Sequence, residues 1–434
     1  MKLSLPATIG MMVNALYNIV DTIFIGRGVG TDAIGGLAIA FPIQMIIMAL
    51  AQMVGIGAAS AVSRSLGEKN IERADYVAGN AFISVFILSS ITVVFGLTFI
   101  DPILKIFGAT DTLLPYAKEY LSVIFMGSIF FSFTVSSNNL VRAEGNAKAS
   151  MFIMIIGTGV NIILDPIFIF VFKLGIRGAA LATIISQFIS FLYILRYMYG
   201  GSSSLKVKLH HLKLKKDILK EIFSVGFSSF ARQSAGSVVA IVLNNSLKFY
   251  GGDMAISIYG TVNKVLMFLF MPLFGVVQGM QPIVGFNYGA KKIARVKEVV
   301  KLSIIITTIL ASVSVLIGEI FPTTIMSVFT NDVAFINDSA NVLRIIMSAI
   351  PFIGIQVVGA TLFQSLGRAV PSLVLSILRQ VLFLIPLILI LPSFFGLGLF
   401  GIWISFPIAD LLSVIVTVVL LRKEMKKISL EVEK

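Results

Sequence analysis

Residues Asn14 to Gly26 read NALYNIVDTIFIG, a mostly apolar stretch that carries one carboxylate, Asp21, near its centre. In a water-exposed loop such a residue needs no explanation. Inside a hydrocarbon layer an ionised side chain is costly to bury and is usually functional. The surroundings of this stretch therefore decide both the fold and the role of Asp21.

The composition of the whole chain is that of a membrane protein. Of its 434 residues 57% are hydrophobic and 13% are charged, whereas a soluble domain carries about 25% charged residues. Apolar runs of about 20 residues, the length that crosses about 30 Å of hydrocarbon, occur about twelve times. The sequence predicts an all-α integral membrane protein whose twelve transmembrane helices are centred on the ranges 5–26, 36–60, 77–100, 120–141, 150–172, 178–198, 222–248, 255–286, 302–325, 340–364, 371–392 and 398–421.

The positive charge of the chain indicates its orientation in the membrane. The formal net charge is +13, and most Lys and Arg fall in loops that share one side if the N-terminus is cytoplasmic. The largest cluster, LKVKLHHLKLKKD from Leu205 to Asp217, is expected to lie on anionic lipid headgroups. We therefore expect a multi-pass, monomeric protein of the cell membrane with both termini cytoplasmic, and lipids instead of nucleic acid as partners.

The scarcity of Cys and His limits the chemistry that the chain can perform. The sequence has no Cys and two His, and both histidines, His210 and His211, lie in the basic linker. Disulfides, thiol nucleophiles and a His-based metal hydrolase within the membrane are excluded. The sequence predicts neither an enzyme nor a resident cofactor.

Short motifs recur along the chain in the same order and at nearly constant separation, which indicates an internal duplication. The pairs are GEKNIERA from Gly67 with GAKKIARV from Gly289, RAEGNAKAS from Arg142 with QSLGRAVPS from Gln364, and LGIRG from Leu174 with LGLFG from Leu397. Six helices per repeat give both halves the same orientation, so a pseudo-two-fold axis along the membrane normal is expected. We predict an N-lobe over 1–198, a basic linker over 199–217 and a C-lobe over 218–434 that ends in a short basic tail.

Polar residues line one face of the first predicted helix. Asn14, Tyr17, Asn18 and Asp21 follow the spacing i, i+3, i+4, i+7, which places them in one stripe. Since lipid cannot solvate that stripe, it is expected to face protein or a water-filled cavity.

The fifth and sixth predicted helices carry further polar pairs. Asn161 and Asp165 share a face in GVNIILDPIFIF, and Pro166 lacks the amide that would bond the Ile162 carbonyl. Thr183 and Gln187 are likewise spaced i, i+4. Carboxylate, amide and free carbonyl oxygens suit a hard cation. The alternative is a purely structural hydrogen-bond network, which would leave both carboxylates without a cationic partner.

The second half differs because it places basic residues within or near its helices. These are Arg232, Lys264, Arg344 and Arg379, and the last helix carries Asp410. We expect Asp410 to pair with one of these cations in a structural role, with a cleft-lining role for Lys264 or Asp410 as the alternative. Ion coupling is therefore expected in the first lobe.

The chain resembles the multidrug and toxic compound extrusion (MATE) family, in particular its MepA-like bacterial branch. The resemblance rests on LYNIVDTIFIG, NIILDPIFIF, LGIRGAALAT and GVVQGMQPIVGFNYGA, which extend over nearly the whole chain. It implies a two-lobe secondary active exporter that expels lipophilic or cationic drugs in exchange for Na⁺ or H⁺ by alternating access. The family's cation site corresponds to Asp21, Asn161, Asp165 and Thr183, and substrate contacts are expected at Asp21, Tyr17, Asn18, Asn161, Asp165 and Gln187.

Other functions remain as alternatives. A flippase for a lipid-linked precursor shares the two-lobe plan, but an anionic pyrophosphate lipid needs cationic residues in the cleft. A channel needs rings of pore-lining carbonyls or charges, and a receptor or scaffold would bind a ligand without moving it. The helix-embedded carboxylates favour the exporter.

Overall fold

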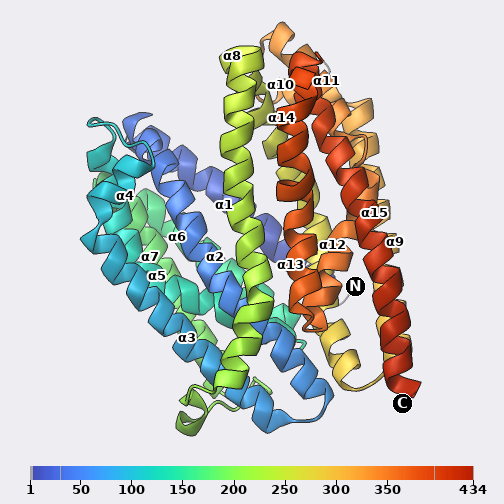
Figure 1. Cartoon of the computed structure of the whole chain (residues 1–434). Coiled ribbons are helices and arrows are strands. Elements are labelled where there is room, and N and C mark those ends of the chain that lie inside the picture. Colours follow the sequence, from blue (N-terminus) through green and yellow to red (C-terminus); the bar gives the residue numbers. More distant parts are fainter. Residues whose placement is uncertain (1–2, 30, 395, 434) are drawn as a thin grey trace. The chain divides into compact units, whose positions relative to one another are not determined.

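The computed structural model describes residues 3–29, 31–394 and 396–433, and its side chains are described outside 14–19, 22–23, 26–27, 31–32, 34 and 430–433. Throughout these ranges the chain forms helices joined by short turns (Figure 1). The helices are α1 (Ser4–Gly28), α2 (Thr31–Gly67), α3 (Ile71–Thr98), α4 (Ile100–Ile106), α5 (Leu114–Ala143), α6 (Ala147–Pro166), η1 (Ile167–Val171), α7 (Gly175–Tyr199), η2 (Leu209–Leu212), α8 (Lys216–Gly289), α9 (Ile293–Ile320), α10 (Pro322–Ser327), α11 (Val333–Met347), α12 (Ile350–Ser365), α13 (Ala369–Ile377), η3 (Leu378–Leu384), α14 (Ile385–Phe394) and α15 (Gly398–Glu433).

The predicted membrane spans appear as long apolar helices. Within the described ranges nine helices are long and apolar enough to cross a membrane, or ten when α11 and α12, bent by 51°, count as one span. The long helix α8 contains two of the predicted spans, because Gly252, with φ 65°, interrupts its helical backbone. The first predicted span corresponds to α1, in which many side chains lie outside the described residues.

By its contacts the chain divides into two compact units, 1–230 and 231–434. In the first unit α5 packs against α2, α3 and α7, while α1 lies along α6. In the second unit α12 packs against α9 and α15. The boundary falls inside α8, so the first turns of that helix belong to the first unit. The lobe boundaries expected from the sequence remain a prediction.

The two sequence repeats share the same turns. Left-handed backbone occurs at Lys69 and Lys291 (φ 60° and 57°), and at Gly145 and Gly367 (φ 91° and 73°), all within the repeated motifs. A Cβ on Gly178 would lie 2.9 Å from the Phe168 carbonyl oxygen, and a Cβ on Gly401 would meet the backbone of Leu391 and Pro392 at 2.8–2.9 Å. Each repeat therefore uses one glycine for the same close helix contact.

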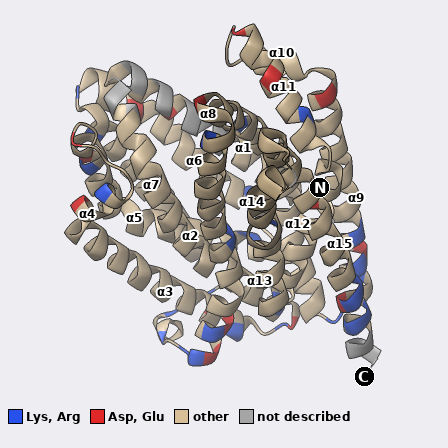
Figure 2. Cartoon of the chain, turned by 45° about the horizontal axis from the view of Figure 1, so that its top comes forward, with Lys and Arg blue, Asp and Glu red and all other residues tan. Residues whose placement is uncertain are grey.

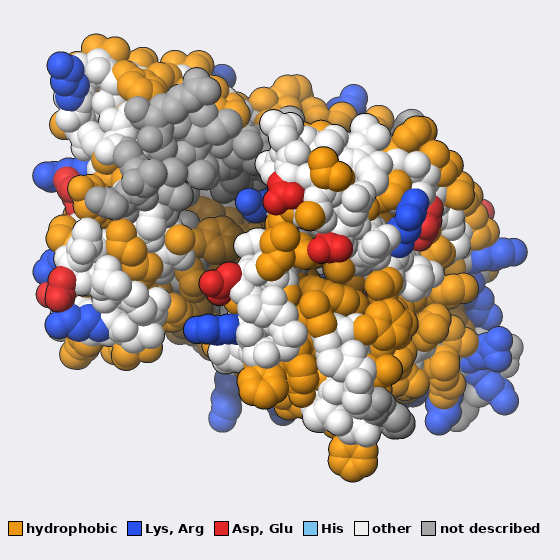
Figure 3. Space-filling view, turned by 90° about the horizontal axis from the view of Figure 1, so that it is seen from above, with side chains coloured by type: hydrophobic (Ala, Val, Ile, Leu, Met, Phe, Trp, Pro, Cys, Tyr) orange, Lys and Arg blue, Asp and Glu red, His pale blue; other side chains and the backbone are white. Residues whose placement is uncertain are grey.

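The backbone of the basic linker is hydrogen-bonded to side chains of α3. The carboxylate of Asp75 accepts a hydrogen bond from the Lys206 amide at 2.7 Å, and Asn80 bonds the backbone of Lys213 and Lys215. In the ribbon of Figure 2 basic residues gather beside α3 at the linker and along the end of α15, whereas most of the ribbon is neither acidic nor basic. The face in Figure 3 instead mixes acidic and basic side chains among apolar ones.

Candidate cation site

Two carboxyl groups from different helices meet inside the first unit. Asp21 of α1 is 9% exposed and Asp165 of α6 is fully buried, and their carboxyl groups lie within hydrogen-bonding reach of each other. The packing of α1 along α6 brings them together. Asn161, one turn before Asp165, donates from Nδ2 to Asp165 Oδ1 at 3.2 Å. The spacing that predicted a shared face for Asn161 and Asp165 therefore produces a direct contact.

Two residues that sequence reasoning missed complete this cluster. The hydroxyl of Tyr120 on α5 accepts a hydrogen bond from Gln44 Nε2 on α2 at 3.0 Å. Tyr120 also lies within hydrogen-bonding reach of Thr183 on α7, and it is close enough to Asp21 and Asp165 to interact with both carboxylates electrostatically. No local spacing marks Gln44, which stands among apolar neighbours, and Tyr120 directly follows the charged pair Lys118 and Glu119, so neither stands out in the sequence as a site residue.

Several oxygen atoms in the cluster lack a hydrogen-bond donor. Among the described residues Asp21 Oδ1, Asn161 Oδ1 and Asp165 Oδ2 are buried without a partner, and no Lys or Arg forms an ion pair with either carboxylate. Buried acceptors normally find a donor or a cation. The donor set, two carboxylates with an amide and hydroxyl oxygens, fits a proton or a hard cation such as Na⁺. It does not resemble a transition-metal site, and no group of three His, Cys, Asp or Glu occurs in the described ranges.

The helix changes its hydrogen bonding directly after Asp165. Pro166 ends the regular α6, and Ile167–Val171 forms the π-helix η1, in which the Phe172 amide bonds the Ile167 carbonyl at 2.9 Å. A Cβ on Gly28 would lie 2.2 Å from Ile169, so α1 approaches this segment closely. Short π-helical segments are frequent at functional sites.

Not every predicted site residue joins the cluster. The backbone of Tyr17 and Asn18 is helical, but their side chains lie outside the described residues, and their roles stay predictions. Gln187 is half-buried one turn from Thr183, and within the described part of the chain it makes no hydrogen bond to the cluster.

The second unit has no comparable pair of carboxylates among its described residues. Asp410 of α15 forms an ion pair with Arg379 of η3, which confirms that Asp410 pairs with one of the nearby cations. Arg344 lies 3.5 Å from Glu319. Lys264 is exposed and Arg232 is half-buried.

Comparison with known proteins agrees with this architecture. The MatE family profile matches residues 6–167 and 227–390. The multidrug export protein MepA of Staphylococcus aureus strain MRSA252 is 30% identical over 397 residues, which cover 92% of this chain and 87% of MepA.

Solved structures are similar over almost the whole chain. An outward-facing multidrug resistance MATE family transporter of the MOP superfamily gives a TM-score of 0.93 at 28% identity, covering 99% of this chain and 95% of that one. A MOP superfamily transporter from Pyrococcus furiosus gives a TM-score of 0.94 with the same identity and coverage. The profile covers most of the chain and these structures share its twelve-helix, two-lobe layout, so the chain belongs to the MatE family of membrane transporters.

Proposed function

We propose that the chain is a secondary active exporter of lipophilic or cationic drugs, driven by Na⁺ or H⁺ entering in exchange. The observation that carries this proposal is the buried pair Asp21 and Asp165, whose free oxygens have no donor among the described residues. The family membership supports transport across the membrane, and the similarity to the multidrug export protein MepA supports multidrug export. The proposal includes a cell-membrane location with both termini in the cytoplasm.

The two carboxylates repel each other when both are ionised, so their approach requires a neutralising partner. A proton shared between them, or a Na⁺ ion with Asn161 and Thr183 as further oxygen donors, supplies it. The Thr183 hydroxyl donates to the Ala179 carbonyl at 3.0 Å and lies within hydrogen-bonding reach of Tyr120, so its oxygen remains able to coordinate an ion. A cationic drug competes for the same negative charge, with Tyr17, Asn18 and Gln187 as its other proposed contacts.

Exchange follows if the drug and the coupling ion favour different conformers. Each ligand shifts the equilibrium only by the difference in its affinity for the two states. The drug then stabilises the outward-open form, and the incoming ion releases the drug and resets the transporter. Each charge that crosses 100 mV of membrane potential contributes about 2.3 kcal/mol.

The test is export of ethidium from proteoliposomes under separately imposed Na⁺ and H⁺ gradients. Wild type is expected to export under at least one gradient, and Asp21→Asn and Asp165→Asn are expected to abolish that dependence. Asp101→Asn is the matched control, because Asp101 pairs with Lys118 at 2.8 Å at an exposed position. Unchanged coupling in both site variants would place the coupling site elsewhere. No export by wild type under either gradient would favour the lipid flippase.

A further inference from the structure

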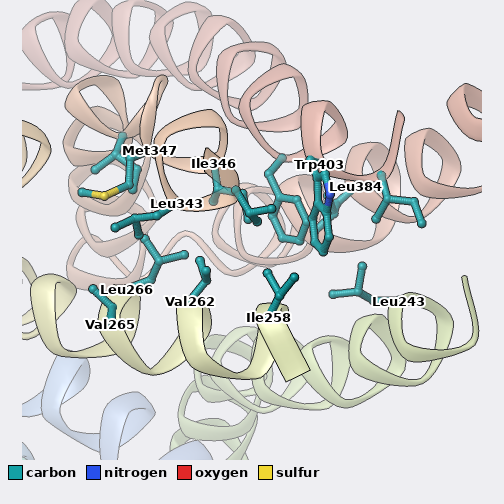
Figure 4. Close-up of a cluster of buried hydrophobic side chains, with 14 of the residues drawn as sticks. Leu243, Ile258, Val262, Val265, Leu266, Leu343, Ile346, Met347, Leu384 and Trp403 are labelled. Carbon is teal, nitrogen blue, oxygen red and sulfur yellow. The ribbon is translucent and has the colours of Figure 1, made fainter. Parts of the chain in front are cut away.

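In the second repeat, an apolar core replaces the cation site. At the separation set by Gly178 and Gly401, the counterparts of Asn161, Asp165 and Thr183 are Leu384, Ile388 and Phe406. All three are at most 5% exposed and belong to the buried apolar cluster around Trp403. Figure 4 shows Leu384 beside Trp403 in this cluster. The ionisable groups of the second unit therefore do not form a second copy of the proposed cation site.

The ion pair between Arg379 and Asp410 is electrically balanced. The Asp410 side chain is 1% exposed and that of Arg379 is 26% exposed, so the carboxylate lies beneath the guanidinium. One negative charge neutralises one positive charge at this place.

Arg232 has no such counter-charge in the described part of the chain. It lies in α8, about 24 Å along the helix from its first residue, at a depth where a charge normally has a partner. The side chain is half-buried, and neither an ion pair nor a hydrogen bond to it occurs within the described ranges. Arg232 therefore carries a positive charge that no described residue neutralises.

The packing is loose one turn along the same face of α8. A Cβ on Gly236 would meet a single atom within 4 Å, Gln380 Nε2 at 3.8 Å. Gln380 follows Arg379 in the π-helix η3, and no hydrogen bond from its Nε2 occurs within the described ranges. An amide donor of the kind that an oxyanion needs therefore lies beside Gly236, one helical turn from Arg232.

We propose that Arg232 is a specificity-determining residue that binds the oxyanion, a carboxylate or phosphate, of the transported compound, with Gln380 as a second polar contact. A planar guanidinium recognises such groups with two parallel hydrogen bonds. The inference rests on the export function proposed above and adds that compounds carrying an acid group are handled through the second unit. A lipid phosphate offers the same chemistry, and the experiment separates the two sources.

The test compares two dyes that share one chromophore. Rhodamine 110 carries a free carboxylate, and rhodamine 123 is its methyl ester. Wild type is expected to export both from phosphatidylcholine vesicles. Arg232→Gln is expected to lower rhodamine 110 export about tenfold and leave rhodamine 123 unchanged, since a lost charged hydrogen bond typically costs about that factor. Arg232→Lys keeps the charge but not the planar pair of donors, so its rhodamine 110 export is expected to fall between that of wild type and Arg232→Gln, with rhodamine 123 export unchanged.

Other outcomes separate the inference from the proposed function. Three outcomes would each overturn the inference alone. Wild type could export rhodamine 123 but not rhodamine 110, Arg232→Gln could leave export of both dyes unchanged, or Arg232→Gln could lower export of both dyes equally. Failure of wild type to export either dye would overturn the export function as well. Native mass spectrometry after reconstitution with phosphatidylglycerol tests whether the bound oxyanion is a lipid phosphate. If wild type carries a bound phospholipid that Arg232→Gln lacks, and the variant exports the two dyes in the same ratio as wild type, the site binds a lipid. That result would overturn recognition of the acid group of the transported compound.

Discussion

Glu221, near the start of α8, forms an ion pair with Arg64 of α2, from which 157 residues separate it in the sequence. Its other carboxylate oxygen pairs with Arg73 of α3 at 2.7 Å. One acidic residue thus holds two arginines at the end of α2 and the start of α3. The contact explains why the first turns of α8 belong to the first compact unit.

Glu221→Gln is expected to lower the free energy of unfolding by about 1–3 kcal/mol, because Arg64 would lose its charge-assisted hydrogen bond to the Glu221 carboxylate. The Arg64 side chain is 11% exposed, so water replaces the lost partner poorly. Thermal unfolding of the purified protein in detergent measures the loss. Asp101→Asn breaks an ion pair with both partners 47% exposed and should cost less than about 1 kcal/mol. Equal losses in the two variants would contradict the buried role of Glu221.

Two glycines let α2 and α8 touch backbone to backbone. A Cβ on Gly57 would lie 1.9 Å from the Ile222 carbonyl oxygen, and a Cβ on Gly226 would lie 1.8 Å from that of Met53. Gly57→Ala should therefore separate the helices and cost about 1–3 kcal/mol. Gly159→Ala is the control, since nothing lies within 4 Å of its added Cβ, and there alanine should stabilise the helix by about 0.5–1 kcal/mol. A Gly57→Ala protein as stable as wild type would disprove the close contact.

The hydroxyl of Tyr120 tests whether the cluster binds the coupling ion. Tyr120→Phe removes the contacts with Gln44 and Thr183 and leaves the ring in place. One lost buried hydrogen bond is worth about 0.5–1.5 kcal/mol, so the ion concentration for half-maximal ethidium export should rise about three- to tenfold. Tyr199→Phe, at a position that is 65% exposed, should leave the ion dependence unchanged. An identical ion dependence for Tyr120→Phe would remove Tyr120 from the site.

Glu144 is expected to make the attachment of the linker depend on pH. It accepts hydrogen bonds from the Ser203 hydroxyl at 2.8 Å and the Ser204 amide at 2.6 Å, and burial raises its pKa above the ordinary value of 4.5. The folded protein therefore holds this proton more tightly than the unfolded chain does. The resulting stability is present below the ordinary value and is lost as pH rises through the folded pKa.

Glu144→Gln has no proton to lose, so it separates this effect from other titrations. The Tm of wild type minus that of the variant should fall as pH rises from 4.5, measured by thermal unfolding in detergent. A difference that stays constant or grows with pH would show that burial does not dominate the Glu144 environment.

Local spacing predicted the parts of the site that lie on one helix. Asn161 and Asp165 are one turn apart, so helical geometry alone brought them into contact. Asp21 entered the prediction because a carboxylate within an apolar span is costly. The apolar runs likewise predicted the helices, since membrane spans must satisfy their backbone internally.

Contacts between helices could not be read from the sequence in the same way. Tyr120 and Gln44 reach the cluster only because α5 packs against α2 and α7. Gln44 has no polar residue three or four positions away, and Tyr120 has only Tyr116. The pairing of Asp410 was expected, but the choice of Arg379 among four basic residues depends on how η3 meets α15. The bonds of Glu221 likewise depend on the path of the linker.

The glycine contact occurs in both repeats, whereas the proposed cation ligands occur in only one, which implies unequal mutational tolerance in the two halves. Positions 178 and 401 should both reject any side chain larger than hydrogen in a deep mutational scan for growth in the presence of a drug. Apolar substitutions should abolish growth with the drug at positions 161, 165 and 183. Polar substitutions should do so at the corresponding positions 384, 388 and 406, which lie in the apolar core. The two copies therefore share one packing constraint, while the proposed cation ligands constrain the first copy alone.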